Sequence, residues 1–300
     1  MPESKSSDTL SKIPSTLWQL RSQHLALTGE PLLMGIVNTT PDSFSDGGRF
    51  SDSDRAVEHA LKLAGDGASI LDIGGESTRP YSDPVGQQEE IDRVLPVIEK
   101  LATQTEIPIS IDTSKAAVAR AAIEAGADII NDVTGLEGDP EMVSVAVETK
   151  AGLCAMHMQG TPQTMQDNPT YTNVVSDILQ YLLQRRDALI AAGIDKNRIC
   201  LDPGIGFGKT HNHNLQLIHQ AVQFHQTGCP ILVGHSRKGF LGKILGDKSA
   251  DRDIATATSA LALASQGIQI IRVHNVAVCR EAIDVWKAIG AMNGRVAEIN

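Results

Sequence analysis

The sequence has few aromatic residues and a minority of basic ones. Aromatic side chains make up 3% of the 300 residues, which argues against a stacking platform for single-stranded nucleic acid. The 26 Lys and Arg residues face 36 Asp and Glu, giving a net charge of −10. This balance argues against broad electrostatic binding to nucleic acid or to an anionic membrane. A small anionic ligand is still allowed, because local charge can oppose net charge.

Long apolar stretches and paired cysteines are also missing. No run approaches the ~20 apolar residues of a membrane helix, and the N-terminus lacks the apolar core of a secretory signal. The cysteines are far apart and form no C-x-x-C motif; they are Cys154, Cys200, Cys229 and Cys279. We expect buried free thiols in a reducing compartment. The sequence therefore predicts a cytoplasmic protein, or one of an organelle stroma.

From residue 31 onward, short apolar runs alternate with amphipathic segments. The predicted strands are 32–37, 69–74, 107–112, 128–133, 152–156, 198–202, 230–234 and 268–273. The predicted helices are 53–65, 87–103, 115–125, 172–192, 252–266 and 276–290. Most of the apolar runs are continuous, which is typical of parallel strands covered by helices on both sides.

Eight such repeats predict an α/β fold of the (β/α)8 TIM-barrel type, whose usual length is ~250 residues. An open, doubly wound sheet is the alternative. We expect residues 31–300 to form this single domain. Residues 1–30 are polar and irregular, so we expect them to be a loosely attached, poorly ordered N-terminal arm.

Polar or glycine-rich clusters follow nearly every apolar run directly. In a barrel, these strand ends all face one mouth, where active sites form. Helix capping is the simpler explanation for residues such as Asp112 and Ser114. It does not explain the larger cationic side chains that share this rim, which are Arg79, Lys238, Arg272 and His274.

Several familiar motifs fail on inspection. The stretch 204–210 resembles a nucleotide-binding P-loop, but Pro203 stands where the first glycine is required. His211 and His213 lack spaced partner ligands, so we expect histidines of a surface loop. There is no G-x-S-x-G or H-E-x-x-H motif, and neither Cys154 nor Cys200 has a base beside it. A protein nucleophile therefore has no support.

The remaining polar residues suit a heterocycle that carries a diphosphate. The carboxylates of Asp112 and Asp202 and the carboxamide of Asn131 can read the N–H donors of a flat ring. A guanidinium such as that of Arg272 can stack on the same ring. An anion site would use Arg79, Ser236, Arg272 and His274, because phosphate sites in barrels often follow the last two strands.

Oxygen ligands and flexible loops complete this interpretation. Asn38 and Asp46 offer the oxygen atoms that Mg²⁺ prefers beside a diphosphate. The loops after Val37 and Ile73 are rich in Gly, Pro and Ser and could close as lids. The residues together indicate a group transfer with diphosphate as the leaving group.

At these residues the sequence resembles the dihydropteroate synthases, the folate-pathway transferases that sulfonamides block. The matching stretches are MGIVNTTPDSFSDGG (34–48), DIGGESTRP (72–80), ISIDTSK (109–115), INDVTG (130–135), MHMQGTPQTMQ (156–166), LDPGIGFGK (201–209), GHSRKGFLG (234–242) and RVHNV (272–276). The resemblance implies a (β/α)8 barrel, a homodimer, and condensation of 6-hydroxymethyl-7,8-dihydropterin diphosphate with p-aminobenzoate. The implied products are 7,8-dihydropteroate and diphosphate.

The resemblance also implies a role for individual residues. The implied pterin site comprises Asp112, Asn131, Met156, Asp202, Phe207, Lys238 and Arg272. The implied diphosphate site comprises Asn38, Thr78, Arg79, Ser236, Arg272 and His274, with Mg²⁺ at Asn38. The implied p-aminobenzoate site comprises Phe44, Asp46, Pro80, Phe207 and Lys238. The implied catalytic residues are Asp112, Lys238, Asn38 and Arg272, acting in a dissociative mechanism that passes through a pterin cation.

Two alternative functions share this scaffold. A pterin-binding methyltransferase domain would keep the Asp and Asn pocket but would not need the loops SFSDGG and ESTRP, which are present here. A non-catalytic pterin-binding protein should have lost some of the polar rim residues. None is obviously lost here, so the synthase interpretation is preferred.

Overall fold

The strands of the barrel occupy the predicted apolar runs. The computed structural model describes residues 14–40, 49–78 and 81–290. Its large sheet has eight parallel strands in the order β8-β7-β6-β5-β4-β3-β10-β9. The strands are β3 (Leu32–Asn38), β4 (Ile70–Gly74), β5 (Ile109–Asp112), β6 (Ile129–Asp132), β7 (Gly152–Met156), β8 (Ile199–Asp202), β9 (Leu232–Gly234) and β10 (Ile270–Val273). A parallel bridge between Leu201 and Ile231 joins β8 to β9, so the sheet closes and the predicted barrel is confirmed.

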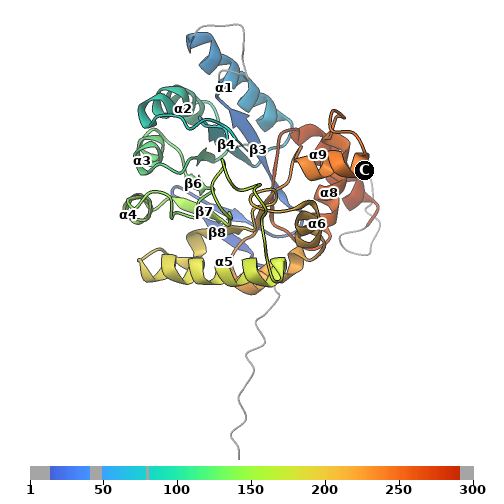
Figure 1. The fold of residues 1–300 in the computed structure, drawn as a ribbon. Coiled ribbons are helices and arrows are strands. Elements are labelled where there is room, and N and C mark those ends of the chain that lie inside the picture. Colours follow the sequence, from blue (N-terminus) through green and yellow to red (C-terminus); the bar gives the residue numbers. More distant parts are fainter. Residues whose placement is uncertain (1–13, 41–48, 79–80, 291–300) are drawn as a thin grey trace, which may run out of the picture.

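Helices surround the strands (Figure 1). They are α1 (Arg49–Gly65), α2 (Gln87–Ala102), α3 (Ala116–Glu124), α4 (Met142–Thr149), α5 (Val174–Ala191), α6 (His211–His219), α7 (Gly239–Leu245), α8 (Asp253–Ala264) and α9 (Val276–Ala288), with 3-10 turns at Lys196–Arg198 and Ala221–Thr227. All the predicted helices form. The sequence interpretation missed α4, α6 and α7, which span only 7 to 9 residues each.

The expectation that His211 and His213 lie in a surface loop is wrong. Both belong to the first turn of α6, and Thr210 caps this helix by accepting a hydrogen bond from the His213 N–H. The His213 ring accepts in turn from the Thr210 N–H, which completes a capping box. These histidines therefore start a helix.

The barrel interior has an apolar layer below a polar one. The apolar layer comprises Met34, Ile70, Ile129, Cys154, Cys200, Leu232 and Ile270. Because side chains alternate along a strand, the residue two positions later points inward again, one layer higher. Those positions hold Asp72, Asn131, Met156, Asp202 and Arg272. The alternation thus delivers the functional side chains to the carboxyl ends of the strands.

Residues 17–26 form a hairpin across the amino ends of the strands. Strand β1 (Leu17–Gln19) pairs antiparallel with β2 (His24–Ala26). Trp18 is fully buried within the lower apolar layer, and its Nε1 donates to the Arg198 carbonyl at 3.0 Å. The expectation of a loosely attached arm is therefore wrong for this segment, while residues 1–13 lie outside the described part. Each strand has three residues, too few for a clear alternating pattern.

Replacing Trp18 with alanine should remove a large part of the barrel's stability. We expect the free energy of unfolding to fall by about 3–5 kcal/mol, because the cavity left by a buried Trp is costly. Urea denaturation followed by circular dichroism measures it. Leu17→Ala is the control, since Leu17 is exposed on the same strand. Equal losses in the two variants would show that the hairpin is not part of the core.

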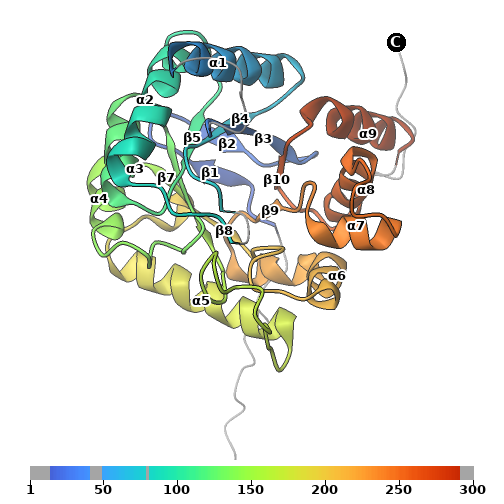
Figure 2. The ribbon, with the colours of Figure 1, turned by 45° about the horizontal axis from the view of Figure 1, so that its top comes forward.

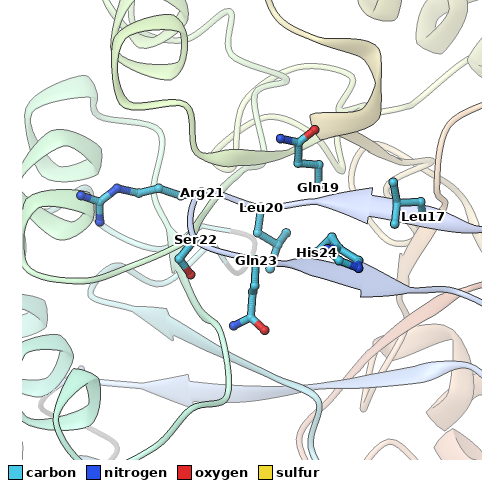
Figure 3. A pocket seen from close by; sticks show the side chains of 7 residues that line it. All are labelled: Leu17, Gln19, Leu20, Arg21, Ser22, Gln23 and His24. Carbon is cyan, nitrogen blue, oxygen red and sulfur yellow. The ribbon is translucent and has the colours of Figure 1, made fainter.

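A cavity of about 380 Å³ lies at this hairpin, lined by residues 17 and 19–24 (Figure 3). Arg21 extends from the turn toward α3 and donates to the Ile123 carbonyl at 2.9 Å. The hairpin covers the amino ends of the strands, so this cavity lies at the end of the barrel opposite the mouth. None of the predicted site residues lines it.

Two further expectations concern the chain as a whole. All four cysteines are buried and free, as predicted. No helix in the described ranges combines the length and apolar character needed to cross a bilayer.

Candidate active site

Arg272 of β10 lies between two carboxylates at the mouth of the barrel. Its Nε donates to Asp72 Oδ2 at 2.5 Å and its Nη2 to Asp112 Oδ2 at 2.6 Å. Asn131 Nδ2 also donates to Asp72 Oδ2, at 3.2 Å. Strands β4, β5, β6 and β10 each contribute one of these four side chains. The predicted residues Asp112, Asn131 and Arg272 thus form one hydrogen-bonded cluster.

The sequence interpretation missed Asp72, which joins this cluster together. Asp72 is completely buried and accepts from both Arg272 and Asn131. Asp72 lies inside an apolar run, whereas the sequence interpretation took its site residues from the positions at the ends of the runs. A charged residue in the middle of an otherwise apolar strand was the available signal, because a buried charge requires a partner.

Burial controls the charges of this cluster. It raises the pKa of Asp112 to about 7, although the Arg272 guanidinium opposes the rise. Burial also lowers the pKa of Arg272, but the carboxylates of Asp72 and Asp112 outweigh it, so the net shift is upward. Arg272 therefore stays positively charged, while Asp112 changes its charge near neutral pH.

The glycine-rich stretch after β8 is a tight turn beneath the site. Asp202 is buried, and its Oδ1 accepts from the Gly204 N–H at 2.7 Å. Gly204 has a φ of +70°, and a Cβ there would lie 2.0 Å from the His157 carbonyl oxygen. At Gly206, with a φ of +86°, a Cβ would lie 2.8 Å from Cδ of Lys238. Only glycine permits these backbone conformations and close approaches.

Lys238, after β9, packs over this turn. Its Nζ donates to the Ile205 carbonyl and lies 4.3 Å from the centroid of the Phe207 ring, a cation–π distance. Burial lowers the pKa of Lys238 to about 7, and the nearby carboxylates of Asp202 and Asp112 oppose this. Phe207 also packs with Met156 in a small apolar cluster at the mouth. The structure therefore brings together Met156, Asp202, Phe207 and Lys238.

A second group of residues forms a cavity of about 400 Å³ beside β3 and β10. Asn38, His274, Arg237 and His59 are among the residues that line it. Ser236 Oγ accepts from the His274 N–H at 3.2 Å and lies 3.0 Å from its Nδ1. Asn38, Ser236 and His274 are thus gathered as predicted, whereas His59 and Arg237 were not predicted.

The N-terminal part of α8 forms hydrogen bonds with the loop after β9. Asp253 accepts two hydrogen bonds from the Arg237 guanidinium, at 2.6 and 2.8 Å, and one from Asn275 Nδ2 at 2.8 Å. Thr256 Oγ1 accepts from the Arg237 N–H at 3.2 Å, and its carbonyl lies 3.0 Å from Nε2 of His235. These contacts hold in place the loop that carries two of the predicted site residues.

An ion-pair network holds the start of the loop after β4. Lys115 Nζ lies 2.5 Å from Glu76 Oε2 and 2.6 Å from the buried Glu90 Oε2. Glu76 Oε1 also accepts from the Val85 N–H at 2.9 Å. Thr78 is half-buried on this loop. The other predicted loop residues lie outside the described part of the chain; they are Phe44, Asp46, Arg79 and Pro80.

Replacing Asp72 with asparagine should destabilise the barrel. We expect a loss of about 3 kcal/mol in the free energy of unfolding, because the buried Arg272 loses one of its two ion pairs and the Asn131 amide loses a charged acceptor. The measurement is urea denaturation at pH 8. Asp187→Asn on the exposed face of α5 is the control and should lie within about 0.5 kcal/mol of the wild type. A similar small loss in Asp72→Asn would contradict the importance of the pair.

The fold and the site together define a class of protein. A (β/α)8 barrel carries a buried carboxylate and carboxamide cluster at its mouth. Next to it is a cavity whose polar lining comprises two asparagines, two histidines, an arginine, a lysine and an aspartate. The profile of the family described as "Pterin binding enzyme" matches residues 34–274. That match spans most of the chain and includes every strand of the barrel except the first two residues of β3.

Similar proteins of known identity show which members of this family the chain resembles. The dihydropteroate synthase of Haemophilus influenzae is 45% identical over 258 residues, 86% of this chain and 94% of its own length. The Yersinia pestis enzyme, solved in a complex with a sulfonamide drug, superposes with a TM-score of 0.85 at 44% identity, over 91% of this chain and 98% of its own. The Xanthomonas albilineans enzyme, solved with 7,8-dihydropteroate, gives 0.82 at 39% identity over the same shares. The chain therefore belongs to the dihydropteroate synthase family of pterin-binding enzymes.

Proposed function

We infer that the chain is a dihydropteroate synthase, a transferase that joins 6-hydroxymethyl-7,8-dihydropterin diphosphate to p-aminobenzoate. In this reaction the C–O bond to the diphosphate breaks, and a C–N bond to the arylamine forms with loss of one amine proton. The observation that carries the inference is the buried cluster around Arg272, whose acceptors suit a pterin ring. Membership of the family and the ligands of its solved relatives support it.

The pterin ring would occupy the polar layer of the mouth. Asp112, Asn131 and Asp202 offer hydrogen-bond acceptors to ring N–H and amino groups. The planar guanidinium of Arg272, which its two carboxylates hold in place, would stack on the ring. The apolar side chains of Met156 and Phe207 would cover the edge of the ring. A buried and pre-formed set of acceptors favours recognition of a heterocycle over a flexible ligand.

The diphosphate would lie in the neighbouring cavity. Asn38 and His274 line it, and Ser236 contacts His274. Arg272 and the two loop residues Thr78 and Arg79 would complete the anion site. Stabilising the negative charge that develops on the leaving group is what such donors do in a transition state. Departure of the diphosphate would leave a pterin cation facing the Asp112 carboxylate.

Mg²⁺ is the cofactor we propose, with Asn38 as its protein ligand. Within the described residues no group of three or more His, Cys, Asp or Glu side chains could hold a metal. The carboxamide oxygen of Asn38 fits a cation that uses few protein ligands and takes its other oxygens from phosphate and water. When bound, Mg²⁺ supplies positive charge that neutralises the diphosphate.

The p-aminobenzoate ring would lie against Phe207 and the Lys238 side chain, at the side of their contact. These two groups are in cation–π contact, and the loop residues Phe44, Asp46 and Pro80 would enclose the second substrate from the other side. The amine would then attack the pterin cation from a site that the loops shield from water.

Product analysis tests this function. Incubation of the protein with the pterin diphosphate, Mg²⁺ and p-aminobenzoate should yield 7,8-dihydropteroate, identified by mass spectrometry, and should stop when EDTA removes the metal. Pterin binding without product under any condition would contradict the proposal. Such a result would favour a methyltransferase domain or a non-catalytic pterin-binding protein.

We also propose that the chain forms a homodimer through α7, α8 and α9, which gather on one side of the molecule (Figure 2). Large apolar side chains are exposed there, namely Ile244, Leu245, Ile254, Val285 and Ile289. Ile254 is the most exposed of them, at 80%. Exposed apolar patches on a folded protein commonly mark interaction surfaces.

The oligomeric state can be tested with one substitution in this patch. Ile254→Glu should convert a dimer into a monomer of about 32.0 kDa, because a charge would be buried in the interface. Light scattering after size-exclusion chromatography gives the mass. Ile190→Glu, at an exposed position of α5, should stay dimeric. A wild-type mass of one chain would contradict the dimer.

We also propose a cytoplasmic location for the protein. The free, buried thiols support it, because unpaired cysteines are typical of reducing compartments.

A further inference from the structure

Lys209 is a buried lysine that the proposed reaction does not use. It closes the glycine-rich turn after β8 and is only 2% exposed. No carboxylate in the described part of the chain forms an ion pair with it. A lysine in such a place is costly, because burial disfavours the charged form. Lys209 ends the stretch 201–209 that resembles the family, but the resemblance gave it no role.

The Lys209 side chain connects two loops of the mouth. Its Nζ donates to the Phe207 carbonyl at 2.8 Å and to the His157 carbonyl at 3.4 Å, and it lies 3.1 Å from His157 Nδ1. Phe207 belongs to the loop after β8, whereas His157 follows β7. Three acceptors around one nitrogen satisfy the three N–H donors of an ammonium group. Lys209 therefore fastens the turn that begins at Asp202 to the neighbouring strand end.

His157 is in the neutral form that can accept a hydrogen bond from Lys209. Burial lowers its pKa to about 3, and the charge of Lys209 adds to the effect, so the ring is neutral. The ring of Tyr181 packs edge-on against it at 4.8 Å between centroids. Tyr171 adds a second link between the same loops, since its hydroxyl donates to the Gly208 carbonyl at 2.8 Å. The contact between Lys209 and His157 therefore belongs to a set of packed and hydrogen-bonded contacts between the two loops.

Charge also links Lys209 to Asp202. Burial raises the pKa of Asp202, and it is opposed by Lys238 from the loop after β9, the Gly204 N–H, Lys209 and Arg272 from β10. Burial and Lys238 in turn lower the pKa of Lys209, and Asp202 opposes them. Asp202 and Lys209 therefore stabilise each other's charged forms.

We propose that Lys209 is a positioning residue for pterin binding, which fastens the turn after β8 to His157 and keeps Asp202 in place as a charged acceptor. The proposal rests on the pterin role of Asp202 given above. Lys209 is not among the residues proposed above to contact either substrate. Removing the ammonium should loosen the turn under Phe207 and raise the pH at which Asp202 loses its charge.

Calorimetric titration of the pterin diphosphate with Mg²⁺ at pH 6, 7 and 9 tests this. For Lys209→Met we expect affinity at least about tenfold weaker than wild type at pH 7, a loss that one unit of pKa change can produce. The loss should shrink at pH 9, because a higher pH favours the charged form of Asp202 in the variant. Lys196→Met, at an exposed position, is the control. An unchanged affinity, or a loss equal at all three pH values, would overturn the proposal.

Two more variants separate the effect of the Lys209 charge from the effect of Asp202 itself. Lys209→Arg retains the charge with different hydrogen-bond geometry, so its affinity ratio to wild type should not fall as the pH decreases. A ratio that falls at low pH overturns the proposal even if Lys209→Met does not fold. Asp202→Asn separates the two levels of inference. Unchanged pterin affinity in Asp202→Asn would refute the pterin role of Asp202. A loss there with none in Lys209→Met would refute only the role of Lys209.

Discussion

Replacing Asp112 with asparagine should lower kcat/KM for the pterin diphosphate by about 10²–10³, the usual cost of removing one stabilising group from a transition state. Asp112 is the carboxylate of β5 that binds Arg272 at 2.6 Å. It would also face the pterin cation left when diphosphate departs. Asparagine keeps the shape of the side chain and removes the charge. Diphosphate release at saturating p-aminobenzoate measures the effect.

The pH profile gives this prediction a second readout. Burial raises the pKa of Asp112 to about 7, so the carboxylate is present above that pH and protonated below it. On the acid side, the wild-type kcat/KM should therefore fall as the pH decreases through about 7, and this decrease should be weaker in Asp112→Asn. On the alkaline side, Lys238, whose pKa burial lowers to about 7, should lose its charge in both enzymes. Asp187→Asn on α5 should retain the wild-type profile. An Asp112→Asn enzyme within threefold of wild type with an unchanged profile, threefold being about 0.65 kcal/mol, would refute the role of Asp112.

Replacing Lys238 with methionine should lower kcat/KM for both substrates by about 10². Removing one member of a buried pair of charged groups costs a few kcal/mol. The ammonium holds the Ile205 carbonyl and lies over the Phe207 ring. It is also the cation that most strongly opposes protonation of the buried Asp202. Its loss should therefore affect the pterin and p-aminobenzoate sites together.

Steady-state kinetics with each substrate varied in turn checks the Lys238 prediction. Lys243→Met is the matched control, because Lys243 lies exposed on the adjoining helix α7. A defect confined to one substrate would show that Lys238 does not connect the two sites. A variant as active as the control would remove Lys238 from the mechanism.

The barrel and most of the site could be predicted from the sequence because one pattern encodes both. Continuous apolar runs mark buried parallel strands, and polar residues such as Asp112, Asn131 and Asp202 lie at or near their carboxyl ends. The topology then brings these positions to one mouth. Periodicity therefore places the residues without any knowledge of their contacts.

The partners of these residues could not be predicted in the same way. Asp72 and Arg272 are 200 positions apart, and nothing in the local sequence of either indicates the pair. Asp72 was missed because it lies within a strand, and Lys209 because the failed P-loop motif gave it no other role. Trp18 shows the same limit, since a single buried aromatic residue in a polar segment has no periodicity to reveal it.

Two ligands that differ only in the diphosphate distinguish the two parts of the site. One mouth should hold a pterin site around Asn131 and a separate anion site around His274. Calorimetric titration should show that Asn131→Ala lowers the affinity for 6-hydroxymethyl-7,8-dihydropterin and for its diphosphate by the same factor. In His274→Ala, only the diphosphate should bind more weakly. Equal losses for both ligands in both variants, or none in either, would contradict the claim.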